Sequence, residues 1–428
     1  MVRLSLTLCI ATLLATYSFA LPFHRAKLEE AKSSFAGNLI DLAIRQYKES
    51  LELAKGAKIE DMDCGRAYMG LAQCSLKKRR PQEAIASMKK ALEIFDKYEK
   101  MPKEEYEKAL DKLIPTANED DDKKTLEMAL NKWMTLINER GDRKDQHLGH
   151  KIFNYGMILA DNDYFGKAES MLLQSLKLFR RHLGEDHRWV VQVHGHLADT
   201  YMDADNFDLA KAEEHTVTQI KKIEKKHDIY SMLLVKPLKR FAAIRREQSV
   251  YGPSAPPDAR SLYLRTIDII QSHEGKETID LVALYYELAS ISFNLNQFEK
   301  AKKYAQKASL IGEQNEDKNK RASALPSLHL LVRLARRAGN KNEADYLEDK
   351  MVTIYLESAK LYAVDITSWF VDIANNLIAR NELEMAVKLL RKTASRFRSR
   401  LGPSSERAIK AEARADEIEA TIKKRKDD

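Results

Sequence analysis

The stretch "YFGKAESMLLQSL" at residues 164–176 returns in altered form as "NFDLAKAEEHTV" at residues 206–217. In each stretch an alanine follows an aromatic residue by three positions, and these two alanines, Ala168 and Ala210, lie 42 residues apart. Self-similarity at a fixed period of about 20 to 50 residues is the sequence signature of repeat architectures. We therefore expect this interval to govern the fold of the whole chain.

The same interval recurs from one end of the chain to the other. Steps of 41 to 43 residues, with one step of 49, connect nine marker positions: Ala43, Ala84, Leu126, Ala168, Ala210, Ala259, Ala301, Ala344 and Ala386. The long step falls between Ala210 and Ala259, where the sequence "YGPSAPPD" (251–258) predicts an inserted loop over residues 249–258.

A second small or apolar position lies twelve residues before the marker in many units. Its members are Ala72, Gly156, Ala198, Ala289, Val332 and Ala374. Paired helices approach closely only where side chains are short, so each unit is predicted to be a helix, a turn and a second helix that cross at these residues. Apolar residues follow at helical spacing, as in Ala168, Leu172, Leu176 and Phe179.

Glycine recurs sixteen residues after the marker, at Gly184, Gly275 and Gly402. Glycine suits the end of a helix, where a left-handed backbone conformation is needed. Two positions depart from the pattern: Leu126 replaces the marker alanine, and Pro115 is expected to interrupt the first helix of that unit.

These markers resemble the tetratricopeptide repeat. The sequence "LGEDH" (183–187), followed by "LADTYMDADNFDLAKAEE" (197–214), is similar to the 42-residue subtype of kinesin light chains, although Arg188 stands where that subtype usually has proline. The resemblance covers nearly the whole chain after residue 20. It implies an all-α fold: a right-handed α-solenoid of about nine helix pairs, closed by a capping helix from about residue 405 to residue 424.

The predicted organisation is a signal peptide (1–20), five repeat units (21–248), the inserted loop (249–258), four repeat units (259–402), and a capping helix with a charged tail (403–428). The signal is predicted from Arg3, the apolar run of residues 4–15, and the small-x-small site Ser18-Phe19-Ala20. We expect a secreted, periplasmic or envelope protein; an uncleaved N-terminal membrane anchor is the alternative.

The sequence offers no recognisable catalytic chemistry. It contains no phosphate-binding glycine loop, Gly-x-Ser-x-Gly, His-Glu-x-x-His or Cys-x-x-Cys motif, so we expect a non-catalytic protein without a cofactor and without a bound metal. The histidine-rich stretch 180–196 is not predicted to bind metal, because His194 and His196 point about 200° apart on a helix. Cys64 and Cys74 are expected to be buried thiols rather than a disulfide.

The first helices of tetratricopeptide repeats line a groove, so the resemblance implies a protein or peptide partner bound there. By phase, the groove-lining residues are Met69, Gln73, His150, Phe153, Met157, Gln192, Asp199, Met202, Tyr286, Ser290, Phe293, Arg333 and Asn375. The alternative is packing alone for the apolar members.

The net charge of +8 leaves a second class of partner open. An anionic envelope polymer or lipid could bind the basic stretches "KKRR" (77–80), "KRFAAIRR" (239–246) and "RKTASRFRSR" (391–400). Export would make such surfaces a more natural counterpart than nucleic acid, which is not expected as a partner.

Overall fold

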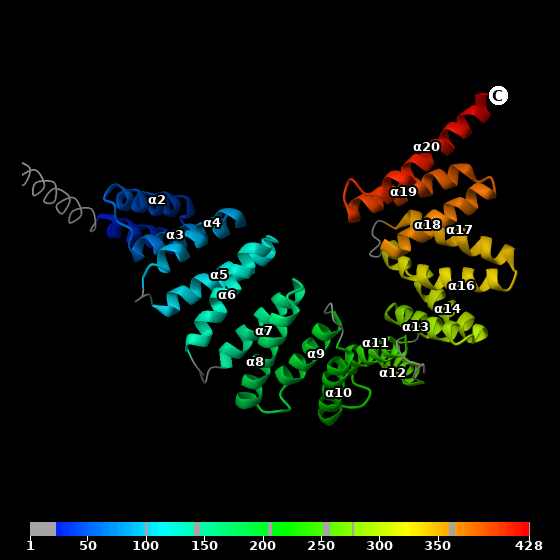
Figure 1. The fold of residues 1–428 in the computed structure, drawn as a ribbon, viewed down its shortest axis with the longest axis horizontal. Helices are drawn as coiled ribbons and strands as arrows, with labels where there is room; N and C mark the ends of the chain where they lie inside the picture. Colours follow the sequence, from blue (N-terminus) through cyan, green and yellow to red (C-terminus); the bar gives the residue numbers. More distant parts are fainter. Residues whose placement is uncertain are drawn as a thin grey trace, which may run out of the picture. The chain divides into compact units, whose positions relative to one another are not determined.

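The computed structural model describes residues 23–98, 102–140, 146–203, 208–250, 257–275, 278–358 and 364–427. Every regular element within these ranges is a helix, and none is a strand (Figure 1). The predicted signal peptide and residues 251–256 of the predicted loop lie outside the described residues. None of the described helices is both long enough and apolar enough to cross a membrane.

The chain divides into two compact units, Met1–Glu185 and Asp186–Asp428. The helices of the first unit are residues 23–36, α2 (Ile40–Gly56), α3 (Met62–Lys77), α4 (Pro81–Phe95), α5 (Lys103–Glu119), α6 (Lys123–Arg140), α7 (Gln146–Asp161) and α8 (Phe165–Leu183).

The second unit contains longer helices and a few short helical turns. Its elements are α9 (Arg188–Asp203), α10 (Leu209–Lys226), η1 (Met232–Leu234), α11 (Val235–Val250), α12 (Pro257–Glu274), α13 (Asp280–Asn294), α14 (Phe298–Glu313), α15 (Lys318–Arg321), η2 (Ala322–Ala324), α16 (Leu325–Arg337), α17 (Lys341–Glu357), α18 (Val364–Ala379), α19 (Leu383–Leu401) and α20 (Glu406–Asp427).

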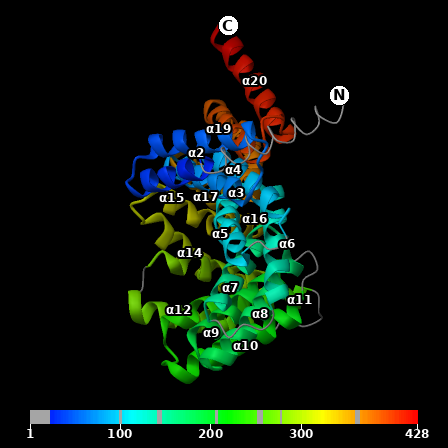
Figure 2. The same ribbon diagram turned by 90° about the vertical axis from the view of Figure 1, so that its left-hand side faces the viewer.

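Within the described residues, neighbouring helices pack as pairs, four in the first unit and five in the second. The predicted loop 249–258 does not separate two repeat units, because residues 249–250 end α11 and residues 257–258 begin its partner α12. The first helices are residues 23–36, α3, α5, α7, α9, α11, α13, α16 and α18, and the helix that follows each one is its partner. The terminal α20 packs along α19, and the two lie side by side in both Figure 1 and Figure 2. The α20 face toward α19 buries Ala408, Ala411, Ala415 and Ile418.

The turn inside a pair explains why the marker is buried. In most pairs the turn after the first helix contains a residue with φ between 55° and 74°, two positions beyond the end of that helix; these residues are Asn38, Arg79, Asp121, Asp163, Asn296, Gly339 and Asn381. Asparagine, aspartate and glycine adopt this left-handed conformation at the lowest cost. The next residue is the N-cap of the second helix, and the marker follows four positions later, one turn into the helix.

Eight of the nine markers are buried as predicted, but Ala210 is exposed. The structure begins α10 later than the period predicts, after the N-cap Asp208, whose carboxylate accepts a hydrogen bond from the Lys211 backbone N–H at 3.0 Å. The residue four positions after that N-cap is Ala212, which is fully buried. The first helix of the pair keeps its predicted phase, because Ala198 is fully buried too.

Two other local expectations meet different outcomes. Gly184, Gly275 and Gly402 have φ near 90°, as expected of glycines that end a helix. With ψ of 161° and 165°, Gly184 and Gly402 occupy a region open only to glycine rather than the left-handed helical one. Pro115 does not interrupt its helix, because α5 continues past it to Glu119.

Candidate partner-binding surface

The predicted groove residues all lie on first helices, and twelve of the thirteen have partly or fully exposed side chains. In the first unit they are on α3 and α7, and in the second on α9, α13, α16 and α18. These twelve side chains are therefore accessible to a partner, and Phe153 is the exception.

Phe153 is a core residue, and its assignment to a binding surface is wrong. Only 4% of it is exposed, and its ring packs against that of Phe179, with 6.4 Å between the ring centroids. His150, one turn earlier on α7, lies over the same Phe179 ring at 4.9 Å but keeps part of its surface exposed. The helical period could not separate these two residues, because both point toward the paired α8.

Met69 and Gln73 line a cavity of about 390 Å³ between α3 and α5. Charged groups surround its apolar floor, and the Arg66 guanidinium donates to both oxygens of Glu105 at 2.8 and 2.7 Å. The hydrogen bond from Arg66 lowers the pKa of the Glu105 carboxyl, and burial only partly opposes it. Both charges of this pair are therefore satisfied within the protein.

Similar ion pairs join the first helices of consecutive pairs elsewhere. Lys151 on α7 contacts Asp111 on α5 at 2.5 Å, and Arg240 on α11 contacts Asp199 on α9 at 2.5 Å. Each pair connects positions about one repeat apart, so the contacts fix the register of neighbouring repeats.

Asp199 was predicted to face a partner, but its carboxylate is engaged within the protein. It accepts from the buried Arg240 and also lies 3.2 Å from Lys236. Burial raises the pKa of Asp199, but the hydrogen bond and charge of Arg240 outweigh burial and lower the pKa below its ordinary value. Asp199 therefore neutralises Arg240, whose side chain is only 5% exposed.

A different arrangement occurs in the second unit, where three successive first helices contribute aromatic side chains and an arginine. We call it the α13–α16–α18 surface, formed by Tyr286, Ser290, Phe293, His329, Arg333 and Trp369. The Arg333 guanidinium lies 4.5 Å from the centre of the Phe293 ring, and the Phe293 ring packs edge-on against Phe298 at 5.7 Å. Phe293 and Trp369 also pack partly against the core, which holds both rings in place.

Arg333 differs from the first-helix cations described above. Within the described ranges it forms no ion pair with a carboxylate, and its side chain is exposed. A guanidinium held over an aromatic ring keeps N–H donors available for a carboxylate on another molecule.

His329 and Trp369 extend this surface from α16 to α18. Their rings stack with centroids 4.0 Å apart and planes inclined by only 8°. Burial, together with the positive charges of Arg333 and Arg336, lowers the pKa of His329 to about 4. His329 is therefore neutral at pH 7, and its ring acts as an aromatic surface.

Sequence reasoning missed both residues. His329 lies 43 residues after Tyr286, the same interval that separates Ala301 from Ala344, so its phase was available as a signal. Trp369 lies outside the groove phase, and its place follows only from its contact with His329.

Most arginines of the basic stretches form ion pairs with carboxylates of the chain, which does not support the expectation of open basic patches there. The pairs are Lys78–Asp41, Arg80–Glu83, Arg240–Asp199, Arg245–Glu213, Arg246–Glu287, Arg391–Asp416, Arg391–Glu419 and Arg398–Glu412.

The histidine-rich stretch does not bring its own histidines together. His194 is buried and approaches His215 of α10, with 2.8 Å between their Nδ1 atoms, and the His215 ring stacks on Tyr201. Within the described part of the chain, one group of three possible metal ligands is found elsewhere, at His24, Asp61 and Cys64. Their separation in the sequence concealed this group.

Comparisons with known proteins identify the repeat. Models of the tetratricopeptide repeat match residues 65–98, 154–188 and 282–311, which correspond to the pairs α3–α4, α7–α8 and α13–α14. The chain therefore contains tetratricopeptide repeats. A search of curated proteins finds no match.

Three solved structures are among those that match the chain. The repeats of a putative kinesin light chain from Podospora anserina share 18% identity over 50% of this chain and 98% of that one, with a TM-score of 0.42. The apo form of RapI shares 11% identity over 94% and 99% of the two chains, with a TM-score of 0.48. A part of a repeat-containing protein from Cytophaga hutchinsonii shares 15% identity over 70% and 99%, with a TM-score of 0.43.

Proposed function

We propose that this chain is a non-catalytic scaffold that binds a protein or peptide segment along the α13–α16–α18 surface. Tetratricopeptide repeats commonly serve as protein-interaction scaffolds. The segment that suits this surface carries a carboxylate for Arg333 and an apolar side chain for the rings beside it.

The observation that carries the proposal is that Arg333 has no carboxylate partner among the residues that the structure describes. Arg66 and Arg240 each have a carboxylate from the neighbouring repeat, whereas Arg333 is held over Phe293 with its side chain exposed. A carboxylate on a partner would receive charge-assisted hydrogen bonds there, and Tyr286 and Trp369 would supply amphipathic contact area at low entropic cost.

A peptide-display selection on the full chain tests this proposal. We expect enriched peptides to combine an acidic residue with an aromatic or large aliphatic one. Their affinity should fall at least about tenfold for Arg333→Glu, because charge reversal removes the attraction and adds repulsion. A library that yields no binder above background would contradict the proposal.

The matched control is Lys300→Glu, which makes the same charge reversal on an exposed residue of the second helix α14. It should leave the affinity unchanged. Equal losses in Arg333→Glu and Lys300→Glu would show that net charge, rather than the α13–α16–α18 surface, drives binding.

Salt separates this proposal from the electrostatic alternative. Association with an anionic polymer or lipid should disappear as ionic strength rises, whereas a peptide that also buries apolar groups should keep part of its affinity. The pairing of the basic stretches with carboxylates disfavours the alternative.

Export is a separate proposal, which rests on the leader-like sequence of residues 1–20. N-terminal sequencing of the protein from its native cells should find a chain that begins at Leu21. A chain that retains its first twenty residues would refute cleavage.

A further inference from the structure

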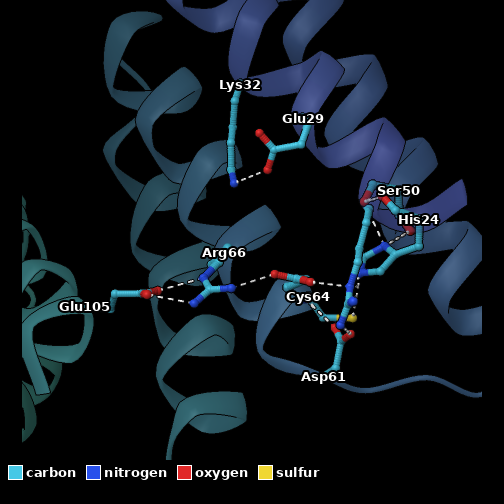
Figure 3. Close-up of polar contacts among 10 residues, drawn as sticks. His24, Glu29, Lys32, Ser50, Asp61, Cys64, Arg66 and Glu105 are labelled. Carbon is cyan, nitrogen blue, oxygen red and sulfur yellow. Dashed lines mark hydrogen bonds and ion pairs between the residues drawn. The ribbon is translucent and has the colours of Figure 1, made fainter. Parts of the chain in front are cut away.

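The helix of residues 23–36 and the start of α3 bring three different metal-binding side chains together. His24, Asp61 and Cys64 point toward one another in Figure 3, and their donor atoms all lie within 4.8 Å. His24 is fully buried and Cys64 is 4% exposed, whereas the Asp61 side chain keeps 22% of its surface exposed.

The imidazole of His24 is oriented by Ser50 of α2. The Ser50 hydroxyl donates to the His24 backbone carbonyl at 2.9 Å, so its only proton is used there. The Ser50 carbonyl oxygen, which has no proton to donate, lies 2.8 Å from the His24 Nδ1, so Nδ1 is the donor, and the Ser50 Oγ, also 2.8 Å away, can only share that proton. Metal-binding histidines are commonly held in this way, because a backbone carbonyl that accepts from one ring nitrogen directs the other toward the ion.

The remaining nitrogen of His24 faces the other two residues. Its Nε2 lies 3.4 Å from the Asp61 Oδ1 and 3.8 Å from the Cys64 Sγ. Zn²⁺ bond lengths of about 2.0 to 2.3 Å at tetrahedral angles place ligand atoms about 3.3 to 3.8 Å apart. The two distances from Nε2 fit that spacing, and the donor atoms of Asp61 and Cys64 lie within 4.8 Å of each other, so side-chain rotation alone would bring all three to one ion.

The Asp61 carboxylate has an oxygen available for an ion. As the N-cap of α3, it uses Oδ1 to accept from the Cys64 backbone N–H at 3.1 Å. Its Oδ2 is buried and accepts no hydrogen bond within the described residues. The nearest cation, Arg25, lies 4.0 Å from Oδ2 and directs its closer contact, at 2.9 Å, to Asp63.

We propose that His24, Asp61 and Cys64 form a binding site for Zn²⁺ that joins the first helix of the chain to α3. An imidazole nitrogen, a carboxylate oxygen and a thiolate are all ligands that Zn²⁺ accepts, and the sulfur disfavours Mg²⁺ and Ca²⁺. Three protein ligands leave one tetrahedral position for water or an outside ligand. The ion and that fourth ligand would enter beside Asp61, because its side chain is partly exposed. This site revises the sequence-based expectation that the chain binds no metal.

Elemental analysis of the full chain, stripped with a chelator, freed of any affinity tag and then dialysed against Zn²⁺, tests the proposal. We expect one Zn²⁺ per chain in the parent protein. Cys64→Ala and Asp61→Asn should each weaken binding by at least about a hundredfold, since the loss of a ligand costs more than the loss of a residue that only orients one. Asparagine at position 61 still caps α3, so this variant separates metal binding from helix capping.

Cys74→Ala is the matched control, because Cys74 is also a buried thiol but lies outside the group of three. It should bind Zn²⁺ like the parent. Co²⁺ should give a sulfur-to-metal charge-transfer band in the parent and in Cys74→Ala, and no such band in Cys64→Ala. Circular dichroism identifies any variant that fails to fold.

Two outcomes would overturn the proposal. One is a parent protein that takes up no stoichiometric Zn²⁺. The other is uptake that folded Cys64→Ala and Asp61→Asn variants retain at parental affinity, because the ion would then be bound by other residues. If one of these variants does not fold, the other decides.

Discussion

Replacing Ala212 with leucine should destabilise the pair α9–α10, whereas the same replacement at Ala210 should not. Ala212 is fully buried in the contact between these helices, so leucine adds three carbon atoms to a closed site. Overpacking of this kind costs about 1 to 3 kcal/mol. For a domain of roughly 150 to 250 residues, this corresponds to a fall in Tm of about 2 to 12 °C.

Ala210 provides the matched comparison, because its side chain is exposed on the same helix two residues earlier. An exposed substitution changes the free energy of unfolding by no more than about 0.5 kcal/mol. Thermal denaturation followed by circular dichroism measures both variants. A lower Tm for Ala210→Leu, with Ala212→Leu unchanged, would refute the register of α10 and restore the one that the period predicts.

Two further predictions concern the charged and titratable groups of the second unit. Its stability should fall as pH drops from about 6.5 to about 4, because histidine in the unfolded chain takes up its proton near 6.5 whereas His329 in the folded chain does so near 4. Urea unfolding at several pH values should show a shallower pH dependence of stability for His329→Gln than for the parent. An equal pH dependence would argue against a buried, neutral imidazole. Asp199→Ala should lower the free energy of unfolding by about 3 kcal/mol, because it leaves the buried Arg240 without its carboxylate. Lys236→Ala, which removes an exposed partner of Asp199, should lower it by less than about 1 kcal/mol. Equal losses in urea unfolding would contradict the role given to the buried pair.

The repeat and its helix pairs were predictable because one physical requirement recurs in most units. A short side chain must stand where two helices cross, and this constraint leaves alanine at a regular interval, as at Ala84, Ala168 and Ala301. The same requirement explains why Ala72 and Ala374 in the first helices are buried.

The register of α10 was not predictable by counting. A period fixes the average length of a unit, but an N-cap decides where a helix begins, and the carboxylate of Asp208 caps α10 two residues later than the interval allows. The expected break at Pro115 does not occur, although proline removes one hydrogen bond of a helix. Burial of the neighbouring α5 residues Ile114, Thr116 and Ala117 in the core compensates for that lost hydrogen bond.

The exposed face of the first helices was predictable from the period, but the contacts of its side chains were not. The repeat period places Phe293 and Arg333 on this face, but it does not show that their side chains stack. Nor does it show that the Asp199 carboxylate accepts a hydrogen bond from Arg240. The cluster of His24, Asp61 and Cys64 has no recognisable sequence motif, because His24 lies on the first helix whereas Asp61 and Cys64 lie at the start of α3. Only the packing of the first two helix pairs brings them together.

Photo-crosslinking from the α13–α16–α18 surface tests the proposed function most directly. A photoreactive amino acid replaces Ser290, which lies between Tyr286 and Phe293 on α13, and in a second variant it replaces Leu310, which is 55% exposed on the second helix α14. A peptide selected on the full chain should crosslink from position 290 and not from position 310. Crosslinking from position 310 alone would place the partner on the second helices and contradict the proposed binding surface.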